Sequence, residues 1–286
     1  MTFGTLLVLS LFIGMALCSL VAPARVEWIA LVLMIGAGIP HGSYDLRVAK
    51  AKWSRAEDSL VSVVLCYLAC VISMSALCIF SPLLGLSLFL VISALHFIEG
   101  ESQSNDPIDA FASTLYGVCA IFLPIGLHLD QTEPYVRYFI RSDLFDMLRP
   151  FLGNSALALT ALLALYAAYE LTTRRNLITS FERGICFLGW IILPPLAGFA
   201  VWFIGRHSRQ HLELCRKIFS TTCSGIPLDF GVISLLAIAG LAPFTMLFDL
   251  SDINQLFAAS ICLIAGLTLP HMIVSHGMRR LPLRTP

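Results

Sequence analysis

The sequence predicts an all-α protein, a polytopic bundle of transmembrane helices. Three observations carry this prediction: 58% of the 286 residues are hydrophobic, only 13% are charged, and the mean hydropathy is +0.85. Apolar runs recur along the whole chain, close to the length of about 20 residues that crosses the hydrocarbon core of a bilayer. Since no soluble domain of ordinary size fits between them, we expect one integral domain over residues 1–286, surrounded by the lipid bilayer.

Nine apolar segments are expected to be helical, and about eight of them to cross the membrane. Pro82 separates the third segment from the fourth so closely that we expect a helical hairpin there. Residues 134–149 combine aromatic and charged side chains in an amphipathic pattern, which predicts a separate helix along the membrane interface. The nine segments cover residues 5–21, 27–39, 59–80, 83–98, 109–129, 154–171, 181–205, 230–248 and 254–274.

The charged residues indicate how the segments cross. The net charge is zero, with 18 basic and 18 acidic residues, so no nucleic-acid partner is expected. Nine crossings would divide Lys and Arg eleven to seven, whereas one non-crossing element between 99 and 153 divides them fourteen to four. Cytoplasmic loops carry the excess of basic residues. Because Gly117 and Pro124 interrupt 109–129, we expect this segment not to span and both termini to be cytoplasmic, in the inner cell membrane.

Histidines fall at the ends of the predicted helices. Five of the seven lie there: His41, His96, His207, His211 and His271. Eight crossings place all five on one side of the membrane, and nine would divide them. The histidines and the charges therefore favour the same topology, with a site near the cytoplasmic side.

The spacing of these histidines is typical of a metal site. His207 and His211 are four residues apart, which leaves them about 40° apart on one face of a regular helix and makes them a candidate chelate. Asp45 follows His41 at the same spacing, so we predict that it accepts a hydrogen bond from the metal-distal nitrogen of that imidazole. Imidazoles without thiolates suit iron, copper, zinc or nickel, and the residue types alone do not choose among them.

Each histidine also has an ordinary interpretation, as an interfacial or packing residue. For His128, beside Asp130, we expect a solvated side chain, and for Glu99 and Glu101 a hydrated loop. Polar groups at membrane depth are nevertheless functional candidates. Four histidines that converge, two of them at chelate spacing, favour a metal site.

Four short motifs occur in order along the chain. They are PHGSYD at 40–45, HF at 96–97, HSRQH at 207–211 and LPH at 269–271. In order and spacing they resemble the motifs of the Brp/Blh family of bacterial and archaeal β-carotene 15,15′-dioxygenases, over nearly the whole chain. The resemblance implies that O2 cleaves β-carotene, or a related carotenoid, centrally into two molecules of retinal. A retinal-binding membrane protein is then a candidate recipient of the product.

The resemblance also implies a ferrous ion, Fe2+, with four ligands: His41, His96, His207 and His211. Asp45 matches the acidic position of the first motif. His271 lies outside this ligand set, and it could be a fifth ligand, a proton donor or a wall residue. We predict a pocket role without metal contact, because four imidazoles leave more room for O2 than five. Asp45 and His271 are thus the predicted catalytic residues.

The chain departs from the family pattern beside the implied ligands. Ile98 stands where the family continues with glycine, and Glu101 stands at about the position of a later aspartate. Arg206 and Gln210 precede the paired histidines. The ligands are retained while their neighbours differ, so the substrate and the cleavage position are less closely implied than the metal.

Three other functions compete with the dioxygenase. A di-iron desaturase or hydroxylase uses more histidines, including adjacent pairs, which this sequence lacks. A membrane metal or small-molecule transporter needs polar groups and broken helices at mid-span, whereas most polar residues here fall at one predicted rim. A non-catalytic accessory protein for retinal-protein biogenesis would keep the same histidines. Retinal production separates these functions.

Overall fold

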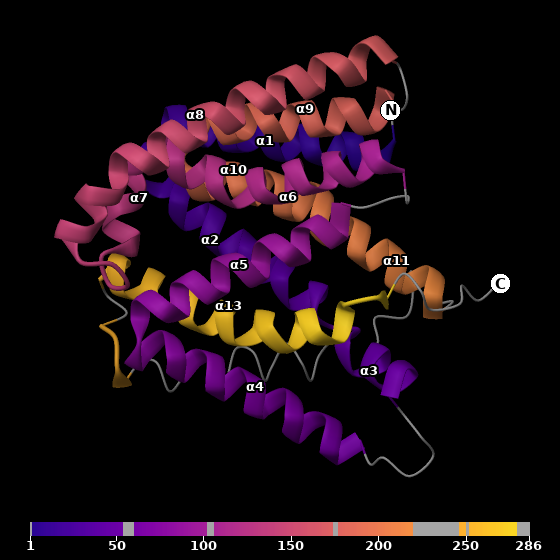
Figure 1. Ribbon diagram of the computed structural model, residues 1–286, viewed down its shortest axis with the longest axis vertical. Coiled ribbons are helices and arrows are strands. Elements are labelled where there is room, and N and C mark those ends of the chain that lie inside the picture. Colours follow the sequence, from indigo (N-terminus) through magenta and orange to yellow (C-terminus); the bar gives the residue numbers. More distant parts are fainter. Residues whose placement is uncertain are drawn as a thin grey trace. The chain divides into compact units, whose positions relative to one another are not determined.

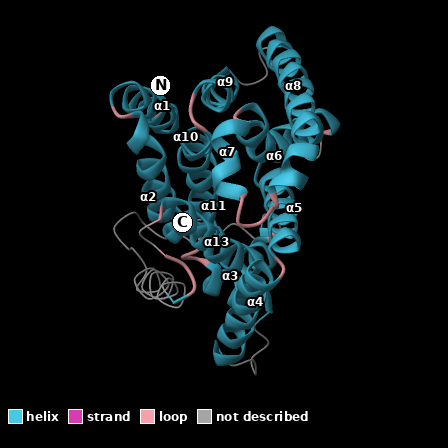
Figure 2. Cartoon of the chain, turned by 90° about the vertical axis from the view of Figure 1, so that its left-hand side faces the viewer, coloured by secondary structure: helices cyan, strands magenta, loops and turns pink. Residues whose placement is uncertain are grey.

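The protein is helical throughout the part that its computed structural model describes. This part comprises residues 2–53, 60–101, 106–173, 177–219, 246–249 and 252–278. Every regular element within it is a helix (Figure 2), so the predicted all-α fold is confirmed. The chain divides into two compact units. The first unit comprises Met1–Gly38, Ala94–Glu133 and Ser142–His211, and the second comprises Ile39–Ser93, Pro134–Arg141 and Leu212–Pro286.

The first unit is a helical bundle with a tryptophan-rich core. Within it α1, α6, α8, α9 and α10 pack against one another (Figure 1), and the Trp190 and Trp202 side chains are fully buried. Its helices are α1 (Phe3–Val21), most of α2 (Pro23–His41), the end of α5 (Pro82–Glu101), α6 (Pro107–Leu127), most of α7 (Leu129–Val136), α8 (Ser142–Thr173), α9 (Leu177–Ile192), α10 (Pro195–Trp202), the π-helix η1 (Phe203–Ser208) and the start of α11 (Arg209–Phe219).

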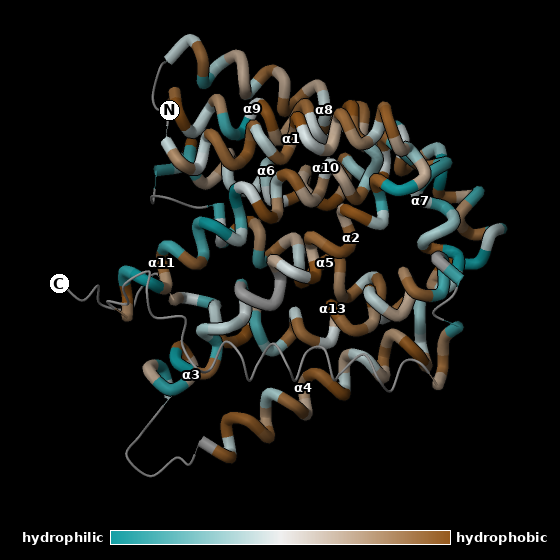
Figure 3. Tube along the Cα trace, turned by 180° about the vertical axis from the view of Figure 1, so that it is seen from behind, coloured by the Kyte–Doolittle hydropathy of each residue, from teal (hydrophilic) through white to brown (hydrophobic). Residues whose placement is uncertain are grey.

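The second unit is built on α13 (Ile253–Ser275), which packs along α4 (Leu60–Phe80) and against α3 (Asp45–Trp53). Gly266 permits the close approach of α13 to α4, because a Cβ there would lie 3.0 Å from the Val71 carbonyl oxygen. Apolar residues follow α4 and hydrophilic ones gather on α3 (Figure 3). Leu65 and Ile72 of α4 are exposed, as expected for a helix that faces lipid.

Six helices of the described part are long and apolar enough to cross a membrane, which indicates a membrane protein. The expected hairpin is confirmed, because α4 ends at Phe80 and α5 begins at Pro82. The predicted segment 230–248 lies outside the described residues except for its last three. The six candidate spans are Phe3–Val21, Val61–Phe80, Pro82–Glu101, Pro107–Leu127, Ser142–Thr173 and Asn254–Ser275.

The reason for excluding 109–129 from the crossings is wrong. α6 runs unbroken through Gly117 and Pro124 and is one of the six candidate spans. Gly117 serves packing, because a Cβ there would lie 2.6 Å from the backbone nitrogen of Ile98 in α5. The glycine therefore lets two helices approach closely and does not interrupt one.

Two other predicted elements differ from the structure. The expected crossing 181–205 is broken at Pro194 and Pro195 into α9, of 16 residues, and α10, of 8 residues. These helices fold back on each other, since a Cβ on Gly198 would lie 2.7 Å from the Gly189 carbonyl oxygen. The expected interfacial helix 134–149 is also wrong, because it contains the end of α7 and the first turns of α8.

Candidate metal centre

In the second unit, a turn after α2 places Asp45 beside His271. α2 ends at His41, residues 42–44 form a turn and α3 begins at Asp45. Asp45 Oδ1 lies 2.8 Å from His271 Nδ1, and the Tyr67 hydroxyl donates to Asp45 Oδ2 at 2.9 Å. The predicted hydrogen bond between Asp45 and His41 required a helix that continues through residues 41–45, and the turn interrupts it. The structure instead gives Asp45 hydrogen bonds with His271 and Tyr67.

His41 and His271 form a buried pair of imidazoles in this unit. Their ring centroids lie 4.6 Å apart and their planes are inclined by 55°. Each residue is 6% exposed, and Asp45 is 2% exposed. Burial, together with the Asp45 carboxylate, raises the pKa of the nearby Cys215 thiol to about 12. In the absence of a metal, this thiol is therefore protonated at neutral pH.

α3 is held against the end of α13 by two further contacts. Lys52 Nζ donates to the carbonyl oxygens of Val274 (2.9 Å) and His276 (2.5 Å), which suits a cation at a helix C-terminus. Tyr44 and Val48 pack in one buried cluster with Val274. Asp45 and Lys52 are seven residues apart, two helical turns, so one face of α3 contacts α13 at both positions.

In the first unit, three imidazoles gather from α5, η1 and α11. The His96 ring centroid lies 5.0 Å from that of His207 and 6.5 Å from that of His211. His96 and His207 are buried, and His211 is partly exposed. The chelate geometry predicted for His207 and His211 assumed a regular α-helix, but His207 lies in the π-helix η1. Such π-helical turns are rare and often occur at functional sites.

Aromatic side chains enclose the His207 imidazole. The Trp202 and Phe203 rings stack on it, with centroids 5.2 Å and 5.8 Å away, and the Phe97 ring meets it at 4.7 Å. Gly100 gives the imidazole room beside α5, because a Cβ there would lie 3.0 Å from its Nδ1 and Cε1 atoms. The ring is therefore fixed by packing on several sides.

A network of buried ion pairs adjoins this histidine cluster through Arg206 and Glu101. Arg206, adjacent to His207, binds Glu101 through two hydrogen bonds, Nε to Oε1 at 2.7 Å and Nη2 to Oε2 at 2.8 Å. Arg183 bridges Glu101 (3.2 Å) and Glu170 (2.6 Å). Such forked pairing combines charge with a fixed geometry.

The network continues through α9 and balances its own charge. Glu182 accepts from Arg206 at 3.4 Å and from Arg209 at 2.9 Å. The Thr5 hydroxyl of α1 also donates to Glu182, at 3.2 Å. Three arginines thus face three glutamates, which allows these charges to be buried. We call this group the ion-pair network; it comprises Glu101, Glu170, Glu182, Arg183, Arg206 and Arg209.

Two expectations about polar residues are wrong. Glu101 was expected in a hydrated loop, but it is 1% exposed because two guanidinium groups compensate its charge. His128 is partly buried, and its Nε2 lies 3.0 Å from the Trp190 carbonyl oxygen, so it is a packing residue. The departures at Glu101 and Arg206 were visible in the sequence, and their charges are opposite, but only the structure shows that they pair. Tyr67 belongs to none of the motifs and was missed.

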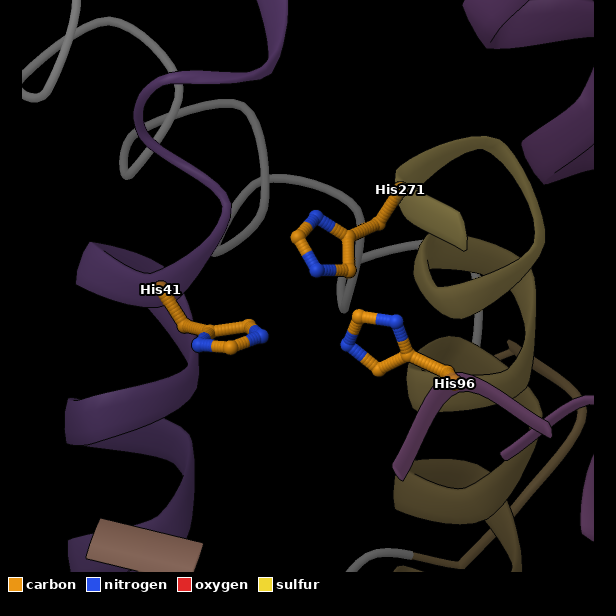
Figure 4. A group of neighbouring side chains, drawn as sticks. All are labelled: His41, His96 and His271. Atoms are coloured by element: carbon orange, nitrogen blue, oxygen red, sulfur yellow. The ribbon is translucent and has the colours of Figure 1, made fainter. Parts of the chain in front are cut away.

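Buried imidazoles are candidate donors for a metal in the described part of the chain. Figure 4 labels three of them, His41 and His271 of the second unit and His96 of the first unit, and each carries ring nitrogens that can bind a metal ion. His207 and His211 complete the histidines named from the sequence. Neutral imidazoles, with a carboxylate behind one of them, suit a borderline transition metal such as ferrous iron. The residues present therefore fit the cofactor expected from the sequence.

Comparison with known proteins supports the same class. The model of a family described as β-carotene 15,15′-dioxygenase matches residues 32–279. A protein from uncultured marine bacterium 66A03, named β-carotene 15,15′-dioxygenase, is 26% identical over 265 residues, which cover 87% of this chain and 92% of that protein. No solved structure matches. The match covers both the His41 and His271 pair and the His96 cluster, so the chain belongs to the β-carotene 15,15′-dioxygenase family.

Proposed function

We propose that the protein is a non-haem iron dioxygenase that cleaves β-carotene at its central double bond with O2 and releases two molecules of retinal. The family relationship and the apolar helices support a carotenoid substrate and a site in the membrane. One observation carries the proposal: the buried imidazoles lie among the residues that the family model matches. We propose His41, His96, His207 and His211 as ligands of one ferrous ion.

The chain's own residues would position the ion and the substrate. A bound ferrous ion would supply the activation of O2, chemistry that no side chain of the protein provides alone. The aromatic rings around His207 present apolar surface to a hydrocarbon substrate and exclude water. A carotenoid is about as long as the hydrocarbon core is thick, roughly 30 Å. The positions of these side chains would decide which double bond faces the metal.

Expression in a host that accumulates β-carotene tests the reaction. We expect loss of the orange colour and formation of nearly two retinal molecules for each β-carotene consumed. Apocarotenals of unequal length would mean that Ile98, Arg206 and Gln210 have moved the cleavage position. No product in the presence of O2, iron and β-carotene would refute the proposal and favour an accessory or transport function.

The ligand assignment is tested through iron content. His207→Ala or His211→Ala should remove most of the iron from the purified protein, because each removes one nitrogen donor. His128→Ala is the matched control, since that imidazole contacts the Trp190 carbonyl oxygen and belongs to neither histidine group. Full iron occupancy in both ligand variants would contradict the assignment.

We also propose that the histidine-bearing helix ends lie near the cytoplasmic face of the inner membrane. Two arrangements with eight crossings divide Lys and Arg fourteen to four: one leaves out 109–129, and the other leaves out 181–205. We favour the second, because α6 is unbroken, whereas 181–205 is broken at Pro194 and Pro195 into α9 and α10, which fold back on each other.

Labelling of single cysteines separates these two arrangements. If 181–205 does not cross, cysteines at 50 and 175 should be accessible from the same face and a cysteine at 137 from the opposite face. If 109–129 does not cross, position 137 should share the face of position 50. The second result would contradict the arrangement that we favour.

A further inference from the structure

We propose that His271 is a ligand of the iron, held in its binding orientation by Asp45 and Tyr67. This inference deepens the proposed function and rests on it. It replaces the role that we predicted for His271 from the sequence alone. That prediction placed the residue in the pocket without metal contact.

The hydrogen bond to Asp45 defines which nitrogen of His271 can bind a metal. An ionised carboxylate only accepts hydrogen bonds, so His271 Nδ1, 2.8 Å from Asp45 Oδ1, carries the proton and donates it. In the neutral form of this imidazole, the lone pair that binds a metal is then on Nε2. A carboxylate bound to the metal-distal nitrogen is the arrangement found behind many metal-binding histidines, where it fixes the tautomer and increases the basicity of the ligand.

The Asp45 carboxylate is itself fixed. Its second oxygen, Oδ2, accepts a hydrogen bond of 2.9 Å from the Tyr67 hydroxyl, so α4 and α13 both contribute a donor to it. Asp45 is 2% exposed, and the Tyr67 phenol is an uncharged donor. A buried carboxylate is stabilised when a positive charge lies nearby. A cation held by His271 would supply that charge through the shared imidazole.

The neighbouring imidazole provides a second donor at the same place. The His41 ring centroid is 4.6 Å from that of His271, with the planes inclined by 55°. Both residues belong to the second unit and both are buried. Because His41 is already a proposed ligand, an imidazole this close to it, whose Nδ1 contacts Asp45 and whose Nε2 can coordinate, is placed to bind the same ion.

Iron content and ligand field test the assignment. His271→Ala should lower the iron bound per chain by about ten-fold or more at limiting iron, an effect in the range found when supporting groups of metal sites are lost. His276→Ala is the matched control, because His276 is an exposed histidine five residues further along. His271→Gly with added imidazole should regain iron, and its Co2+-substituted form should recover the wild-type visible spectrum, which a packing role would not produce.

The outcomes separate this inference from the proposed function. If the wild type binds iron and forms retinal while His271→Ala keeps wild-type iron content and the wild-type Co2+ spectrum, His271 is not a ligand and the proposed function stands. If His271→Ala loses iron but imidazole restores neither iron nor spectrum to His271→Gly, the role is packing and the inference fails. If the wild type binds iron through His271 but forms no retinal, the function fails and the ligand assignment stands.

Discussion

The two histidine groups are supported in different ways. In the second unit, one imidazole is oriented directly by a side chain, through the hydrogen bond between His271 and Asp45. In the first unit, the support acts on the backbone: Arg206, next to His207, and Glu101, five residues after His96, are joined by two hydrogen bonds. Direct support fixes one ring, whereas the ion-pair network fixes the helices that carry two rings.

This difference separates metal affinity from folding. Loss of a direct hydrogen bond leaves the helices in place and changes one ligand. Loss of a charge from a buried network leaves its partner charge without compensation and affects the whole unit. We therefore expect substitutions in the network to act first on stability, and substitutions at Asp45 or Tyr67 to act first on iron binding.

The largest effect is expected for Arg206→Ala. Removing one partner of a buried ion pair costs about 3–5 kcal/mol, and Glu101 would lose both of its hydrogen bonds to Arg206. We expect a marked decrease in the midpoint of thermal unfolding of the detergent-solubilised protein, with loss of iron as a consequence.

Two variants sharpen this result. Arg149→Ala removes a guanidinium that pairs with Asp130 and Glu133 at the surface, where such pairs contribute about 0–1 kcal/mol, so it should unfold like the wild type. The double variant Glu101→Gln/Arg206→Met should recover part of the lost stability, because the four remaining charges still balance. Equal unfolding midpoints for Arg206→Ala and Arg149→Ala would show that the network does not support the fold.

An intermediate effect is expected for Asp45→Asn. The substitution keeps the size of the side chain but replaces the acceptor that orients His271, and such changes reduce metal affinity or activity by about 10–100-fold. Iron titration should show this loss while thermal unfolding of the iron-free protein stays close to wild type. Asp130→Asn, at an exposed position, is the control. Unchanged iron affinity in Asp45→Asn would remove the proposed support.

The smallest effect is expected for Tyr67→Phe. This change removes one hydrogen bond to a carboxylate, of the class that contributes about 1.5–3 kcal/mol, but it leaves the bond between Asp45 and His271 intact. Iron affinity should fall by less than in Asp45→Asn. Tyr138→Phe, on a partly exposed ring of the second unit, should not change it. If Tyr67→Phe matched the loss in Asp45→Asn, the phenol itself would be indispensable to the orientation of His271.

Several features of the fold could be predicted from the sequence. The apolar runs located α1, α4, α5 and α6 within a few residues, because the length and hydropathy of a membrane helix are local properties of the chain. The same signal failed at 181–205, where the composition is apolar except at Glu182, Arg183 and the two prolines. There Pro194 and Pro195 were the visible sign of a break, since neither can continue a helix by donating a backbone hydrogen bond.

The sequence by itself determined the helical class, the family motifs and the histidines worth considering. Only the tertiary structure decided how their supports pair. Asp45 and His271 are 226 positions apart, and Glu101 and Arg206 are 105 positions apart. A spacing rule describes neighbours on one helix, so it paired Asp45 with His41 and gave Glu101 no partner. Hydrogen bonds between distant segments depend on which helix ends the packing brings together, and this is a property of the folded chain as a whole.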